Sequence, residues 1–83
     1  MIEPTEVEAR FTTDGQIRVL SVTWAGAKLP VVSQGRSWGA DDGLHYLVMI
    51  PGDRVMELLY EPLKGHWSVT RTWVELFGGG LRG

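Results

Sequence analysis

The sequence predicts an all-β fold: a small antiparallel, six-stranded meander that closes into an open barrel or roll of SH3-like size, with no substantial helix. Apolar and polar residues alternate along most of the chain, and turn signals recur about every ten residues. The 83 residues have room for one domain, and a chain this short buries only about 60–65% of its unfolded surface. We expect a compact domain over residues 1–75 and a glycine-rich tail over 76–83.

Six strands are expected between glycine-containing turns. The turns are Asp14-Gly15, Gly26-Ala27 and Pro51 to Arg54, where glycine supplies a positive φ. The strands are Glu6–Thr12, Ile17–Ala25, Lys28–Gln34 with a continuation past Gly35 to Trp38 left open, Leu44–Pro51, Val55–Glu61 and His66–Val74.

Turn geometry predicts which residues face the core. In the first half, two-residue turns place one set of apolar side chains on a common face: Val7, Ala9, Phe11, Leu20, Val22, Trp24, Leu29 and Val31. In the second half, a two-residue turn at Gly52-Asp53 sets Leu47 opposite Leu58 and Met49 opposite Met56. We expect these four side chains to face inward, together with Tyr60, Trp67 and Val69.

The reverse face of the second half is also apolar. It carries Tyr46, Val48, Ile50, Val55 and Leu59. An apolar face of this size needs a cover. Either the C-terminal segment with Leu76 and Phe77 covers it, or another subunit does, so we treat these five residues as a candidate interface.

Composition limits the plausible functions. The net charge is −2 and the basic residues are scattered singly, so the chain lacks a strong footprint for duplex DNA. The absence of cysteine excludes disulfides, thiolate zinc sites and a cysteine nucleophile. No signal-peptide pattern or membrane-length apolar run is present. We therefore expect a cytoplasmic protein with no membrane partner.

Catalytic, cofactor and metal sites are not expected. Asp41 and Asp42 lie in a predicted turn and lack the further oxygen ligands that a hard cation needs. His45 is interpreted as a partly buried residue with one hydrogen-bond partner, and His66 is expected on the opposite face, which disfavours zinc. The serines lack an elbow motif. The carboxylate pairs, including Glu57 with Glu61, are interpreted as solvated, so we expect no enzyme.

Aromatic and basic residues gather at one end of the predicted sheet. Arg71 shares a strand face with Trp73, and Arg36 lies two residues before Trp38. Such pairs suit a stacking surface for single-stranded nucleic acid or a peptide. The alternative is that the four tryptophans fill the core.

The segments VTWAG, GRSW, GLHYLV, VMELLYE and GHWSV resemble a family of small uncharacterised bacterial proteins over Val19–Val74. Some members of that family are encoded near DNA-repair polymerase genes, which implies an accessory role. The segment LPVVS, residues 29–33, departs from the family pattern. The function expected from all of this is a non-enzymatic interaction or accessory module that forms a homodimer or binds another protein, with single-stranded nucleic-acid binding linked to DNA repair as the alternative.

Overall fold

The computed structural model describes residues 3–74 of the chain and contains strands without helices in that range. This confirms the all-β prediction for the described residues. The strands are β1 (Glu3–Thr5), β2 (Val7–Phe11), β3 (Ile17–Trp24), β4 (Ala27–Pro30), β5 (Ser33–Ala40), β6 (Gly43–Ile50), β7 (Arg54–Glu61) and β8 (His66–Val74).

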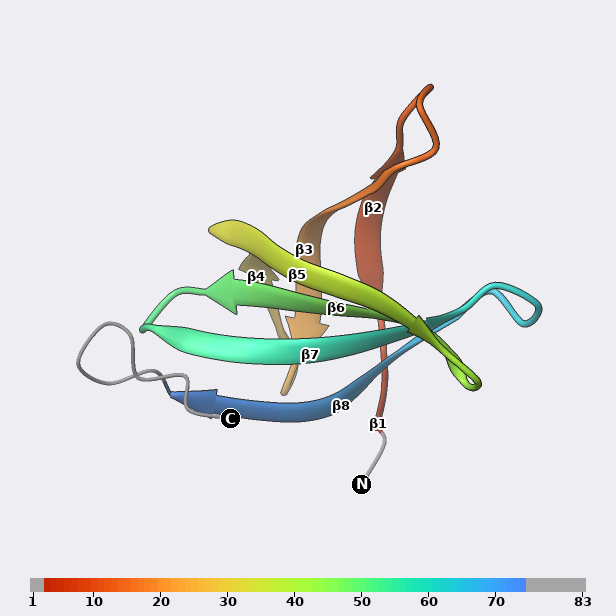
Figure 1. Cartoon of the computed structure of the whole chain (residues 1–83). Helices are drawn as coiled ribbons and strands as arrows, with labels where there is room; N and C mark the ends of the chain where they lie inside the picture. The colour runs from red at the N-terminus through yellow and green to blue at the C-terminus, as the bar shows by residue number, and fades with distance from the viewer. Residues whose placement is uncertain (1–2, 75–83) are drawn as a thin grey trace.

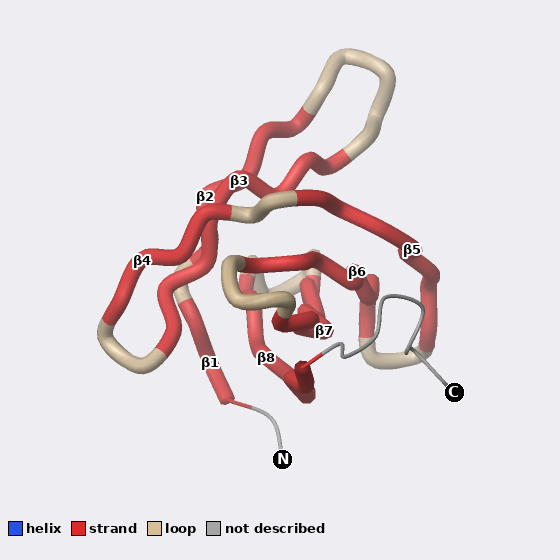
Figure 2. Tube along the Cα trace, turned by 90° about the vertical axis from the view of Figure 1, so that its left-hand side faces the viewer, coloured by secondary structure: helices blue, strands red, loops and turns tan. Residues whose placement is uncertain are grey.

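The strands form two antiparallel sheets (Figure 1). The five-stranded sheet has the order β1-β8-β7-β6-β5, and the three-stranded sheet has the order β2-β3-β4. Figure 2 shows the larger sheet curled, with β2, β3 and β4 grouped on one side of it. Eight strands in two sheets replace the expected six-stranded meander, and the described strands do not close into a barrel.

The predicted strand Lys28–Gln34 is divided into β4 and β5 because the chain changes sheets within it, and β1, which precedes the predicted strand Glu6–Thr12, was not expected. The amide of Val31 donates to Leu20 O in β3, whereas the next amide, Val32, donates to Met49 O in β6. The same change occurs near the N-terminus, where Thr5 pairs with Trp67 and the carbonyl of Glu6 accepts from the Thr23 amide. At each place the chain passes from one sheet to the other within about one residue. Such a short transition does not alter the apolar pattern of the sequence.

In the three-stranded sheet, β3 and β4 present the predicted faces from Val22 to Val31, but the paired residues differ from the prediction. The turn between β3 and β4 is Ala25-Gly26, with φ of 52° and 80°, one residue earlier than expected. A turn displaced by one residue moves each partner by two, so the faces are preserved. Between β2 and β3, however, the register shifts after Glu8. Leu20 is therefore 41% exposed, and Val19, at 3%, takes the core position.

Register between β6 and β7 inverts the prediction. Ile50 pairs with Arg54 across three turn residues, not two. This odd shift turns every β6 side chain over. Val48 therefore pairs with Met56, and Leu47 pairs with Glu57. The buried core between the sheets consists of Val19, Val22, Tyr46, Val48, Ile50, Met56, Leu58 and Val69.

Candidate functional site

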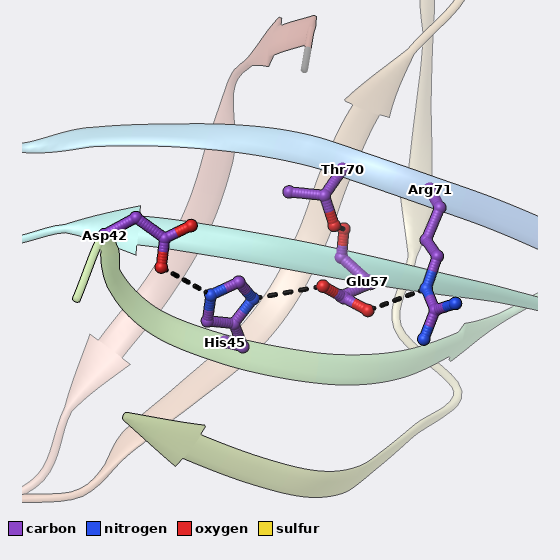
Figure 3. Close-up of polar contacts among 5 residues, drawn as sticks. All are labelled: Asp42, His45, Glu57, Thr70 and Arg71. Atoms are coloured by element: carbon purple, nitrogen blue, oxygen red, sulfur yellow. Dashed lines mark hydrogen bonds and ion pairs between the residues drawn. The ribbon is translucent and has the colours of Figure 1, made fainter. Parts of the chain in front are cut away.

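Four ionisable side chains form a continuous chain across β6, β7 and β8 (Figure 3). Asp42, in the turn between β5 and β6, accepts a hydrogen bond at 2.8 Å from His45 Nε2. His45 Nδ1 lies 3.0 Å from Glu57 Oε2. The other oxygen of Glu57 accepts from Arg71 Nε at 2.8 Å. Charges of alternating sign thus follow one another from the turn to the far strand.

Local structure explains why these residues meet. The turn Asp41-Asp42 closes the β5–β6 hairpin and is followed by Gly43 at φ 141°, so the predicted loop is confirmed. Gly43 approaches β7 so closely that an added Cβ would lie 2.4 Å from Tyr60 O. Asp42 precedes His45 by three residues, so the turn places the two side chains within hydrogen-bonding distance. On the opposite side, Thr70 Oγ1 donates to the Glu57 carbonyl at 3.3 Å beside a bulge between β7 and β8.

His45 carries a positive charge in this arrangement. Ionised carboxylates only accept hydrogen bonds, so both ring nitrogens must bear a proton to satisfy Asp42 and Glu57. Burial alone would lower the pKa of His45, but the hydrogen bonds to the two carboxylates and their negative charges outweigh burial and raise it. The residue is 8% exposed. The expectation of a single partner is wrong; His45 has two.

The sequence predicts a solvated Glu57, but the residue is buried, with 7% of its surface exposed. Burial would raise the pKa of its carboxyl, but hydrogen bonds from Arg71 and His45 and the Arg71 charge lower it. At Asp42, the hydrogen bond from His45 lowers the pKa. The two carboxylates balance the positive charges of Arg71 and the protonated His45, so the formal charges of the chain cancel.

Two arginine–tryptophan pairs flank the charge chain. Trp38 stacks on His45 with ring centroids 5.1 Å apart and planes 5° from parallel. Arg36 lies over Trp38 at 5.5 Å, and Arg71 lies over Trp73 at 4.9 Å. The predicted pairs are thus both formed, and they are connected by contacts through His45 and Glu57. Trp38 has both an imidazole and a guanidinium against its ring, whereas Trp73 has a guanidinium alone.

The candidate apolar interface is not a single exposed face. Its β6 members, Tyr46, Val48 and Ile50, point into the core between the sheets. Val55 and Leu59 lie on the opposite face, since they pair with Met49 and His45. All five are buried, at 1–7% exposure. The inverted register explains the correction. Leu76 and Phe77, the proposed cover, lie outside the described residues.

The charge chain is unsuited to general acid–base catalysis by His45. Both imidazole nitrogens are occupied, so neither is free to take a proton from a substrate. Within residues 3–74, no three His, Cys, Asp or Glu side chains are arranged to hold a metal ion. His66 lies apart at the start of β8 and is exposed. The arrangement can fix strands relative to one another.

A separate open groove of about 560 Å³ lies where β2 and β3 meet the start of β8. Its polar groups largely satisfy one another: Ser21 donates to Glu8 Oε1 at 2.8 Å, and Lys28 lies 3.0 Å from the same oxygen. Its aromatic wall, Trp67, packs against Tyr60 with centroids 4.6 Å apart. The polar side chains of the groove therefore bond to one another and are not directed at a ligand.

Sequence reasoning missed the link between Asp42, His45 and Glu57. One signal was present: Glu57 is the single charged residue inside the apolar run VMELLY. A lone acid in a buried strand needs a partner. The correct strand register would identify His45 and Arg71 as neighbours of Glu57.

The sequence matches no protein-family model, and no curated protein and no solved structure is significantly similar to the chain. The resemblance to the bacterial family stays a prediction. In the described part of the chain, no helix has the length and apolarity that crossing a membrane requires.

Proposed function

We propose that this chain is a non-enzymatic interaction module that binds a second copy of itself, or a partner protein, by adding a strand to the outer edge of β5. The observation that carries the proposal is the position of β5 at the end of the five-stranded sheet. Within residues 3–74, no strand pairs with its outer side. An unpaired edge presents a row of backbone donors and acceptors that another strand can join.

The sequence of β5 supports this use. The strand SQGRSWGA, residues 33–40, contains no proline and one charged residue, Arg36. Proteins usually protect an edge with lysine, proline or a very short strand. The one protecting device here is a bulge between Gln34 and Ser37. A symmetric pair of β5 strands would join two sheets around a two-fold axis.

Sedimentation equilibrium of wild type and two lysine variants tests the proposal. Ser37→Lys adds a charge to the exposed edge and is expected to weaken self-association, whereas Thr13→Lys adds the same charge to the exposed β2–β3 turn and is not. A wild-type protein that stays monomeric at high concentration and takes no partner at β5 would contradict the proposal. Equal weakening by both variants would also count against it, since the effect would then be one of net charge.

A second candidate is single-stranded nucleic-acid binding by Arg36, Trp38, Arg71 and Trp73. The pairing of each arginine with a tryptophan favours it, and the net charge of −2 counts against it. Binding would quench tryptophan fluorescence on addition of an oligonucleotide, and salt would reverse the quenching. The absence of quenching at low salt would remove this candidate. This second candidate includes a link to DNA repair, and for either function we propose a cytoplasmic location.

A further inference from the structure

Two groups that fix the end of β5 both depend on His45. Trp38, in β5, stacks on the imidazole with centroids 5.1 Å apart, and Asp42, in the turn after β5, bonds to Nε2 at 2.8 Å. His45 itself lies on β6 and is tied to β7 through Glu57. The imidazole thus joins the C-terminal half of the edge strand and its turn to the interior of the sheet.

Loss of one proton from His45 would break this junction at a definite place. A neutral imidazole has one N–H donor and one lone pair, so it can serve only one of the two carboxylates. Glu57 is buried and also bonded to Arg71, whereas the Asp42 side chain is 53% exposed and can be solvated. The proton therefore stays at Nδ1 for Glu57, and the lone pair at Nε2 repels Asp42.

The stack with Trp38 would weaken in the same step. A cationic ring placed over an indole gains from the negative face of the indole, and a neutral ring loses that gain. The charged groups near the ring are Asp42 from the turn, Glu57 from β7, Arg71 behind Glu57 on β8, and Arg36 of β5, which lies over Trp38. The two carboxylates contact the ring directly, so the cationic form is the one that this environment favours.

We propose that the charge on His45 regulates the pairing of β5 with β5 of a second copy: the cationic imidazole holds the edge rigid and ready to pair, and the neutral imidazole releases Asp42 and Trp38 and weakens pairing. This regulation rests on the proposed function of β5 as a docking edge. Its physical basis is preorganisation, because a partner strand then binds an edge that is already ordered.

The test combines two measurements on the full chain. NMR titration of the histidine ring signals gives the His45 midpoint, and sedimentation equilibrium gives the dimer dissociation constant on both sides of that midpoint. In wild type we expect the dissociation constant to rise about fivefold or more above the midpoint, the lower end of ordinary coupling between linked equilibria. His66→Gln, which removes the exposed histidine, should keep this dependence, and His45→Gln should lose it. Asp42→Asn should reduce it, since the turn then carries no charge to release.

The outcomes separate this inference from the proposed function. A dimer whose dissociation constant is the same on both sides of the midpoint, or changes equally in His45→Gln, would leave β5 docking intact and overturn the regulation. A protein that is monomeric throughout would overturn self-association at β5. In that case the amide-exchange protection factors of β5 test whether the charge on His45 orders the strand. In wild type the protection of β5 should be lower above the midpoint than below it, and in His45→Gln it should be the same on both sides. Unchanged protection in wild type would overturn it.

Discussion

The side chain of Gln34 pairs with the backbone of Val19 as a neighbouring strand would. Its Oε1 accepts the Val19 amide at 2.8 Å, and its Nε2 donates to Ile17 O at 2.9 Å. One amide thereby joins β5 of the larger sheet to β3 of the smaller one, at the point where β5 begins. Both backbone groups belong to a half-buried region, so they depend on this side chain for a partner.

Gln34→Glu should destabilise the fold at neutral pH by about 1–3 kcal/mol, because a carboxylate oxygen would face Ile17 O without a proton between them. The introduced carboxyl would have a folded pKa above its unfolded value. The destabilisation should therefore ease as the pH falls through that raised pKa, when the carboxyl can donate again. Denaturant unfolding at neutral and acidic pH measures this. Gln16→Glu, in the exposed β2–β3 turn, is the control for charge, and an equal effect there would refute the interpretation.

Gly43→Ala should be far more damaging than Gly39→Ala. At Gly43 a Cβ would approach Tyr60 O to 2.4 Å and φ is 141°, whereas at Gly39 the nearest atom is the flexible end of Leu44 at 3.8 Å. We expect a loss of about 2–3 kcal/mol or more for the first variant, from strain and backbone displacement, and a change within about 0.5 kcal/mol for the second. Thermal unfolding of the two variants provides the comparison. Similar melting temperatures would contradict the close approach of the β5–β6 turn to β7.

Leu58→Ala and Leu20→Ala make the same chemical change at two positions that the sequence places alike in the core. Leu58 is fully buried, and truncation should cost about 3 kcal/mol through lost burial and a residual cavity. Leu20 is 41% exposed at the bulge, so its truncation should cost less than about 1 kcal/mol. Urea unfolding resolves the difference. Equal losses would mean that the register shift between β2 and β3 is absent.

Glu57→Gln should cost about 2–3 kcal/mol, since it removes charged hydrogen bonds to both His45 and Arg71. It should also lower the pKa of His45, because one of the two carboxylates that raise it would be gone. Unfolding measures the first effect and NMR titration the second. Glu61→Gln, which affects a surface ion pair with Lys64, should leave His45 unchanged. A His45 titration that is unaltered by Glu57→Gln would show that the two side chains do not interact in solution.

The charge chain should give wild type a stability maximum on the acidic side of neutrality. The folded pKa of His45 is raised from 6.5, so its contribution is complete below pH 6.5 and is lost as the pH rises through the folded value. The folded pKa of Glu57 is lowered from 4.5, so its contribution is present above pH 4.5 and is lost as the pH falls through the folded value. Both are complete between pH 4.5 and 6.5. Unfolding free energies across this range test the point, and a maximum displaced well above pH 7 would contradict it.

Much of the fold follows from alternation and turn residues, and the errors arise where a single residue changes parity. The Ala25-Gly26 turn was predicted one residue late without consequence, because the faces of β3 and β4 did not change. The Pro51 to Asp53 turn was predicted one residue short, and every β6 side chain was assigned to the wrong face as a result. Loop length at this accuracy depends on backbone φ angles, such as 55° at Asp53, that the sequence does not reveal.

The candidate site was predicted only in part, for the same reason. The pairs Arg36 with Trp38 and Arg71 with Trp73 are two residues apart on one strand, so local periodicity was sufficient to find them. The contacts of His45 with Glu57, and of Glu57 with Arg71, cross between strands and depend on register. One incorrect turn length and one bulge in β8 were enough to hide them.

The pairing of β1 with β8 has a consequence for how the chain acquires its structure. Glu3 lies opposite Val69, so the five-stranded sheet joins the first described strand to the last. During synthesis, β1 has no partner until nearly the whole domain has left the ribosome, whereas the β2–β3 hairpin and the β6–β7 hairpin can form as they emerge. Closing so long a loop is entropically costly and slow. The docking of β1 should therefore be the last event of folding. Until it occurs, the larger sheet has a second free edge, at β8, where nascent chains of the same protein can meet.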